Sequence, residues 1–476
     1  MIGAIARKDL VVLRRDGRVI ALLSLLGALV LLALLTAWTT HVEHEQQVRQ
    51  AQAEDSAAFE RQGNKPSHSA AHFGRMAYKP PAPLAVFDPG VSPYLGQVIW
   101  LEAHRQDPAM FRPAEDAPEL GRLADLSVAG VLTSLLPLLI FVMGYGAFAA
   151  ERERGTLRQV MTAGVRQGAV FAGKLIAVAG TGVCVVSVVI AVATAAAVIV
   201  GDGHSAVDTI ARGTGVLSGY AAYACACAGV ALLVSAVART ATSALLILLT
   251  VWAAGVVVAP RVAASAGQGL HRTPDANTFW SGTSDAILSA RPKRGSDALR
   301  DVERQVVSRA IGRELSSDEA MPASLNRAAL GQEISEVLGA QVYAETYAAL
   351  YATYDRQRDT RRVASILSPT IALSHWSAAL AGTDLAAHRH FTLAAERQRQ
   401  QLLRRINEDM MVIGAGQGYD YLAAAGFWRT VPDFAYSSPP VSFAVRAARI
   451  DLLLLLAWTG LVVAAAWHVA RRQTAI

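Results

Sequence analysis

The residues GAVFAGKL, at 168–175, have the glycine and lysine spacing of a loop that binds the phosphates of a nucleotide. In such a loop the lysine is followed by a Ser or Thr that holds magnesium, but here Leu175 follows Lys174. No buried strand precedes the segment and an apolar run follows it, so we interpret Lys174 as an anchor at a membrane–water interface. The sequence therefore predicts no ATPase site, no catalytic residue and no cofactor in this chain, which is not expected to be an enzyme.

Histidines that lie close together in the sequence could bind a metal ion. They are His41 and His44, His68 and His72, and His388 and His390. A metal site needs three or four converging ligands with supporting hydrogen bonds, and pairs at these spacings do not establish convergence. Hydrogen-bonded or solvated histidines are the favoured interpretation, and no metal ligand is assigned.

The composition is that of an integral membrane protein. Of the 476 residues, 53% are hydrophobic and only 17% are charged, with a mean hydropathy of +0.32. The net charge of +6 is placed as the positive-inside rule requires, so nucleic acid is not an expected partner. The three cysteines all lie in apolar runs, and no disulfide framework is predicted.

Six apolar stretches are long enough to cross a membrane as helices. They are residues 19–38, 127–149, 175–200, 215–237, 243–260 and 450–470. The second contains Pro137, which neighbouring helices can accommodate by satisfying the carbonyl that it frees. The stretches contain essentially no acidic or basic residues, so proton coupling through buried acids is disfavoured.

Basic residues assign the orientation, because they gather in the short segments on one side of the six spans. They are Arg7, Lys8, Arg14, Arg15 and Arg18 near the N-terminus, Arg152, Arg154, Arg158, Arg166 and Lys174 in the loop 150–174, then Arg239, Arg471 and Arg472. The short loop on the other side has only Arg212. A multi-pass protein of a bacterial inner membrane with both termini in the cytoplasm is predicted, and the first span lacks a convincing signal-peptide cleavage site.

The segments 39–126 and 261–449 then lie in the periplasm. Residues 39–62 lack Gly and Pro, so the first span is expected to continue as a polar helix, whereas the prolines of 72–96 predict an extended, irregular segment. Helices are expected after caps at 296–297, at Ser324 and at Thr383 or Asp384. The predicted fold class is an all-α integral membrane protein, with six transmembrane helices and a large, mainly helical periplasmic domain built from these two insertions.

Two cytoplasmic segments could bind a soluble partner. Residues 1–18 place apolar side chains on one helical face and basic ones off it, which predicts an amphipathic helix on the lipid surface. The loop 150–174 begins with ERERGTLRQVMTAG, whose alternating charges suit either a solvated helix end or a docking site.

This arrangement resembles the permease of type-2 ABC transporters. The resemblance rests on ERERGTLRQVMTAGVRQGAVFAGKL after the second span, on the N-terminal helix and on the six spans. The large insertions and HFGRMAYKPPAPLAVFDPGVSPYLG resemble a bacterial subfamily whose role is poorly defined. By this resemblance the ATPase-coupling residues are Glu151, Arg152, Glu153, Arg154, Gly155 and Thr156, and Arg7, Lys8 and Asp9 belong to the interfacial helix.

The resemblance implies a permease subunit of an exporter, paired with a second copy or a homologous permease and with a separate ABC ATPase that binds ATP and magnesium. Spans two and five would line the path. An alternative is a mechanical transmitter, in which the ATPase cycle moves the periplasmic domain against a partner protein. A third is a sensor or structural membrane protein without an ATPase. The sequence does not identify the cargo.

Overall fold

The computed structural model describes residues 1–476 apart from 117–125, 202–203, 318 and 473–476, so parts of the expected segment 39–126 and of the loop 201–214 lie outside the described residues. Six described helices are long and apolar enough to cross a membrane, which confirms the predicted all-α class with six spans. They are α2 (Gly17–Glu60), α6 and α7 (Val128–Gly144, Ala149–Glu153), α9 (Gln167–Val200), α10 (Ala206–Val237), α11 to α12 (Ala241–Leu270), and α18 (Val441–Arg471).

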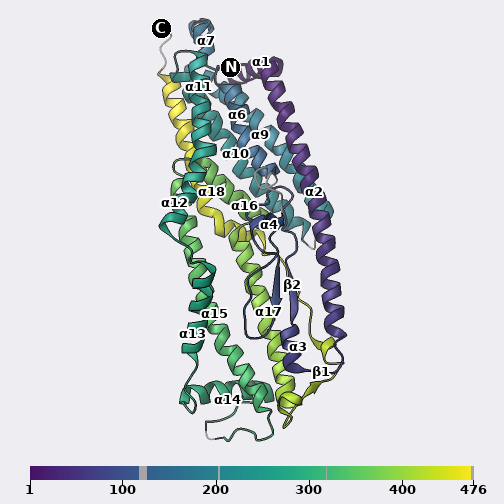
Figure 1. Ribbon diagram of the computed structural model, residues 1–476. Coiled ribbons are helices and arrows are strands. Elements are labelled where there is room, and N and C mark those ends of the chain that lie inside the picture. Colours follow the sequence, from purple (N-terminus) through teal and green to yellow (C-terminus); the bar gives the residue numbers. More distant parts are fainter. Residues whose placement is uncertain (117–125, 202–203, 318, 473–476) are drawn as a thin grey trace.

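The N-terminal residues form a separate helix, α1 (Ile2–Arg15). It ends at Asp16, whose carboxylate accepts a hydrogen bond from the N–H of Arg18 and so caps the start of α2. Figure 1 shows α1 at the end of the helical bundle where both chain termini lie. Helix α2 then runs for 44 residues, about 66 Å at 1.5 Å per residue, which confirms that the first span continues as a polar helix.

A short helix of the second insertion packs among the spans. Helix α16 (Pro369–Ala381) lies against α10 and α18, and its Trp376 Nε1 donates to the carbonyl of Gly215 at 2.8 Å. A Cβ on Gly219 would lie 2.4 Å from Trp376 Cδ1, so the indole needs a glycine at this position of α10. The sequence did not predict α16.

The proline-rich segment covers the outer end of this bundle. Strand β2 (Arg75–Tyr78) pairs antiparallel with β3 (Val98–Leu101), so the expectation of irregular structure from residue 72 is wrong for those residues. The chain after β2 is irregular and buried, and the Phe87 ring packs edge-on against Tyr220 of α10.

The two insertions fold together as one outer domain. The elements from the first insertion are β1 (Lys65–Pro66), α3 (Ser67–Phe73), β2, η1 (Ser92–Tyr94), β3 and α4 (Pro113–Asp116). The second adds α13 (Ala276–Ala290), α14 (Asp297–Ile311), α15 (Arg327–Ala364), α17 (Leu385–Val412), η3 (Gly418–Asp420), β4 (Leu422–Ala423) and η4 (Trp428–Thr430). Strand β1 pairs with β4, and side chains of both insertions share one core.

The first residues of three helices in the second insertion can be compared with the N-caps that the sequence predicted. Ser296 caps α14 and Asp384 caps α17, each by accepting a backbone N–H, which confirms those two expectations. The expected start at Ser324 is wrong, because Asn326 caps α15 with its side-chain oxygen.

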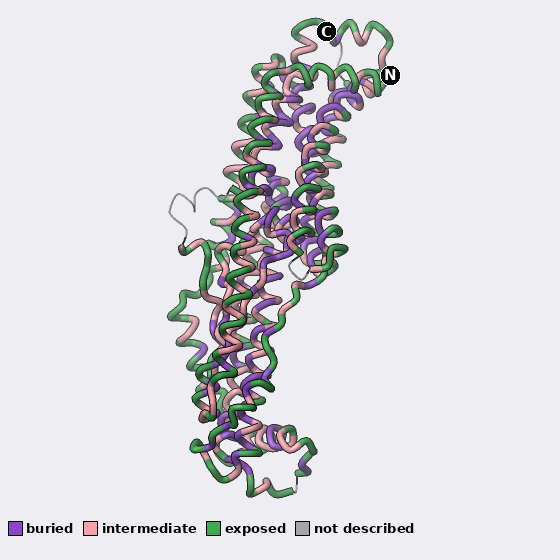
Figure 2. The backbone as a smooth tube through the Cα atoms, turned by 90° about the vertical axis from the view of Figure 1, so that its right-hand side faces the viewer, coloured by how far each residue is buried: buried purple, intermediate pink, exposed green. Residues whose placement is uncertain are grey.

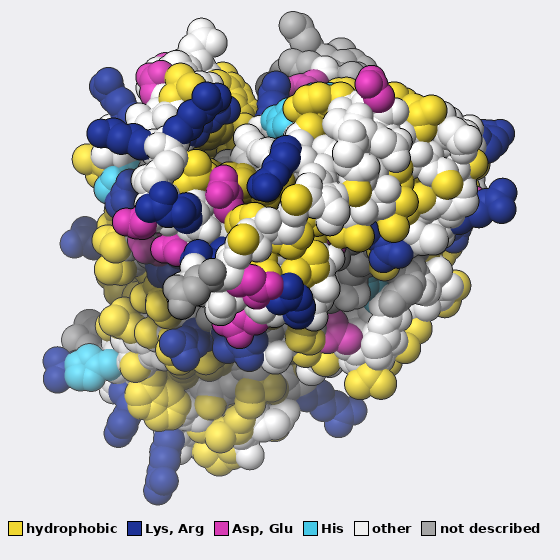
Figure 3. Space-filling view, turned by 90° about the horizontal axis from the view of Figure 1, so that it is seen from below, with side chains coloured by type: hydrophobic (Ala, Val, Ile, Leu, Met, Phe, Trp, Pro, Cys, Tyr) yellow, Lys and Arg dark blue, Asp and Glu magenta, His cyan; other side chains and the backbone are white. Residues whose placement is uncertain are grey.

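The outer domain and the bundle form one elongated molecule. In Figure 2 buried residues follow the inner sides of the helices through both parts. The far end of the outer domain, seen in Figure 3, mixes basic, acidic and hydrophobic side chains.

Two buried charged residues lie where the sequence analysis did not expect them. Arg212 lies within α10 rather than in a loop; it pairs with Asp208 at 2.6 Å and donates to the carbonyls of Leu380 and Pro439. Asp451, inside the expected last span, is 0% exposed and pairs with Arg362 at 2.7 Å and His375 at 3.2 Å. These contacts connect α10 and α18 to the second insertion.

We expect Trp428→Ala to destabilise the outer domain by about 3–5 kcal/mol. Trp428 is 0% exposed and packs edge-on against Phe59, and its Nε1–H donates to the carbonyl of Gly63 at 2.7 Å. Hydrogen exchange of the purified protein should show faster exchange across the outer domain while the spans stay protected. The control is Leu422→Ala, at a side chain that is 52% exposed. Equal exchange in both variants would contradict the expected role of the indole.

Candidate functional site

The segment after the second span turns sharply at Gly155. Helix α7 ends at Glu153 and α8 (Thr156–Thr162) begins after Gly155, whose φ of +70° is in the left-handed region that favours glycine. A Cβ there would meet no atom within 4 Å, so glycine is needed for its conformation and not for space.

Glu151 lies at the centre of a cluster of charges. Its Oε1 is 2.6 Å from Lys8 Nζ on α1 and 3.0 Å from Lys174 Nζ on α9. Lys174 also contacts Asp9 Oδ2 at 3.4 Å. We call Lys8, Asp9, Glu151 and Lys174 the charge cluster. The interpretation of Lys174 as an interfacial anchor is wrong, because the residue is 2% exposed and pairs inside the protein.

The electrostatics of Lys8 reflect this pairing. Burial alone would lower the pKa of Lys8, but the hydrogen bond and the charge of Glu151, together with Asp9, raise that pKa above its usual value. The ammonium is thus held in its charged form across the neutral range, and α1 stays bound to α7.

Arg152 points the other way and binds the end of α10. Its guanidinium donates to the carbonyls of Ala236 and Ala238, both at 2.7 Å. Carbonyls at a helix C-terminus lack partners within the helix, so this bond satisfies them and ties α7 to α10.

Of the remaining residues of the segment, some are exposed to solvent and one is buried. Glu153, Arg154, Gly155 and Thr156 are exposed, as is Arg7 on α1. Leu157 is buried in a small apolar cluster with residues of α9, α10 and α18, among them Phe171. The predicted residues therefore come together, but Glu151 and Arg152 make internal contacts while the next four face solvent. The sequence does not reveal that Lys174 pairs with Glu151 and Asp9. Its only signal is a lone cation near the start of a long apolar helix.

A cavity of about 310 Å³ lies within the bundle between the second and fifth spans. Pro137 and Phe141 of α6 line it, facing Trp252 and the π-helical turn η2 (Ala253–Val258) of the fifth span. Pro137 frees the carbonyl of Thr133, which accepts a hydrogen bond from Tyr223 Oη at 3.3 Å. The second and fifth spans, two of the helices that line the cavity, thus both depart from regular α-helical hydrogen bonding.

A second cavity, of about 490 Å³, opens at the outer end of the first span. Residues of α2, including Thr36 and His41, line it together with prolines of the proline-rich segment and Lys79. Burial lowers the pKa of Lys79 to about 8, against a smaller opposing effect of Asp384. This cavity combines apolar walls with one cationic group.

The six spans define a multi-pass membrane protein. A family model described as "ABC-2 family transporter protein" matches residues 3–384, from α1 past the end of α16. The chain belongs to this family and is a permease of an ABC transporter. A search of curated proteins returned no match.

We expect Glu151→Gln to lower the stability of the protein, because Lys174 would lose its nearest carboxylate while buried. Removing one partner of a buried ion pair typically costs about 3–5 kcal/mol, and we expect about 2 kcal/mol here because Asp9 remains near Lys174. Thermal unfolding of the purified protein measures the change.

The matched control is Glu153→Gln, at an exposed carboxylate of the same helix, which should leave the unfolding temperature unchanged. Equal unfolding temperatures for the two variants would contradict a structural role of the charge cluster.

Proposed function

We propose that the chain is the membrane subunit of an ATP-driven exporter in a bacterial inner membrane, with both termini in the cytoplasm. A separate ABC ATPase, which binds ATP and magnesium, docks on the exposed face of α7 and α8, and a second permease copy or a homologous permease completes the complex. The observation that carries this proposal is the segment from Glu151 to Thr156, whose first residues bind the bundle while its last four remain available.

The internal contacts of this segment supply a route for force. A force applied to Glu153 or Arg154 would be transmitted to α1 and α9 through the charge cluster, and to α10 through Arg152. Leu157 fixes α8 to the apolar cluster at the same end. ATPase closure would therefore move several spans together and would not bend only an isolated loop.

The cavity between the second and fifth spans is the proposed path for the cargo. The proline of α6 and the π-helical turn of the fifth span border it, and such interruptions of a helix are places where it can change conformation. The outer cavity beside Lys79 opens nearer the outer end of the bundle and is the proposed exit.

Glu153→Lys should lower the permease-stimulated ATP turnover of the reconstituted complex about fivefold, the equivalent of losing an interaction of about 1 kcal/mol with the ATPase. Membrane insertion should not change, because Glu153 is exposed and lies outside the charge cluster. Glu314→Lys, at an exposed residue near the end of α14, is the control. Unchanged turnover in Glu153→Lys would refute the docking role.

A second candidate function, mechanical transmission to a periplasmic partner, is favoured by the continuity of α2. This single helix connects the α1 end of the bundle to Phe59 in the core of the outer domain. The outer domain is bound again to the last span through Arg362 of α15 and Asp451. A movement of the spans would therefore be transmitted outward.

Two substitutions distinguish the candidates in a complex labelled at residue 314 of each permease copy. Val256→Trp fills the cavity between the spans, and Gln50→Pro interrupts α2 outside the membrane at a cost of about 3 kcal/mol. Mechanical transmission predicts that Gln50→Pro abolishes the ATP-dependent change in label distance while Val256→Trp preserves it. A distance that does not respond to ATP in the unsubstituted complex would refute transmission.

A further inference from the structure

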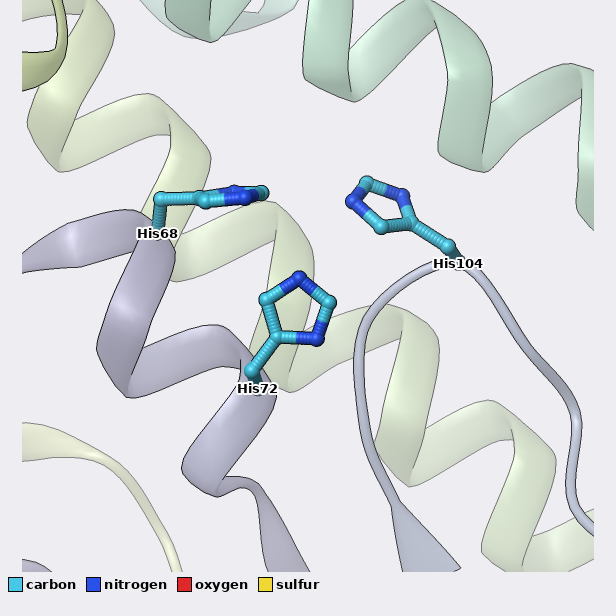
Figure 4. A group of neighbouring side chains, drawn as sticks. All are labelled: His68, His72 and His104. Atoms are coloured by element: carbon cyan, nitrogen blue, oxygen red, sulfur yellow. The ribbon is translucent and has the colours of Figure 1, made fainter.

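Three histidines of the outer domain converge at one point. His68 and His72 lie on α3, and His104 lies in the chain after β3. One ring nitrogen from each lies within 4.8 Å of the other two, and the ring centroids are 4.7 to 5.7 Å apart. Figure 4 shows nitrogens of His72 and His104 directed into the space between the rings.

Groups outside the cluster bind the opposite sides of the His68 and His104 rings, and a carboxylate lies near that of His72. His104 Nδ1 is 2.9 Å from Glu336 Oε1, and His72 Nδ1 is 4.0 Å from Glu102 Oε2. His68 Nδ1 is 2.7 Å from the Gln332 side-chain amide, whose oxygen and nitrogen can exchange places by a half turn. Imidazoles that bind metals are supported in this way, because a carboxylate or amide oxygen accepts the Nδ1–H and leaves Nε2 as the ligand.

The position of His104 is maintained at a conformational cost. Its φ of +65° is in the left-handed region, which a residue with a Cβ rarely adopts. The carboxylate of Glu336 stabilises this conformation by accepting the backbone N–H of His104 at 2.5 Å, and Arg399 in turn holds Glu336 at 2.8 Å. The loop is therefore constrained to present its imidazole to the other two.

Neutral imidazoles in this arrangement suit a bound cation. When each Nδ1 is directed away from the cluster, the three Nε2 lone pairs face a common point, where one metal ion can accept all three.

We propose that His68, His72 and His104 bind one divalent transition-metal ion of the Zn²⁺ type through their Nε2 atoms. Zinc–nitrogen bonds of about 2.0–2.1 Å require the rings to move slightly closer together than they are here. His72 and His104 are exposed, so the fourth ligand position faces solvent. The supporting groups Gln332 and Glu336 belong to α15, so the metal strengthens the contact between the two insertions. The site does not depend on the proposed transport function.

The test uses the full chain in lipid nanodiscs, purified without a polyhistidine tag and stripped of metal with a chelator. Titration with Zn²⁺ should show one ion per chain and a raised unfolding temperature, whereas Mg²⁺ and Ca²⁺ should do neither. Co²⁺ should give the visible absorption bands of a low-coordinate site with nitrogen ligands. No stoichiometric Zn²⁺ binding would overturn the proposal.

Variants locate the ion. His72→Ala and His104→Asn should each weaken Zn²⁺ binding at least a hundredfold, and Glu336→Gln about tenfold to a hundredfold. His390→Ala is the matched control, since His390 lies elsewhere in the outer domain beside Tyr436. Circular dichroism and unfolding without metal show whether each variant folds. Zn²⁺ affinity that survives in folded His72→Ala and His104→Asn would overturn the assignment.

Discussion

The carboxylate of Glu151 accepts contacts from lysines of two different helices, and the end of the bundle where both chain termini lie depends on this arrangement. Without it, α1 would be held to the spans mainly by its apolar contacts with α9, and Lys174 would be a buried charge paired only with Asp9. With it, α1, α7 and α9 form one unit. The neighbouring Arg152 adds α10, so the proposed docking surface of a few residues is connected to several spans of the permease.

Polar contacts have a similar role at the opposite end of the bundle. Lipid tails are as apolar as the helix surfaces, so close contact at small residues and hydrogen bonds determine where the helices associate. Gly219 makes room for the Trp376 indole and Gly215 for Leu380, while Arg212 binds the end of α16 and the entry to the last span. The outer domain is therefore placed by a few specific bonds.

The sequence predicted the features that depend on local pattern. Hydropathy is sufficient for the six spans, because a membrane helix needs a long apolar run. The extension of α2 followed from the absence of Gly and Pro, and the caps at Ser296 and Asp384 from their side chains. Features that depend on contacts between residues distant in the sequence could not be predicted from it. Lys174 looks like any other cation beside a span, and His104 is distant in sequence from the histidines that it meets.

The buried pairs Asp208–Arg212 and Asp451–Arg362 also limit which parts of the protein could be deleted. Each pair lies on or beside a span, and each is completed by residues of the second insertion or of the segment that follows it. A shortened chain from which that insertion had been deleted would leave Asp451 without Arg362 and His375 and would open the hydrogen bonds of Arg212. The outer domain is therefore not a detachable addition to a complete permease, since its removal would take away the partners of two buried charges of the spans.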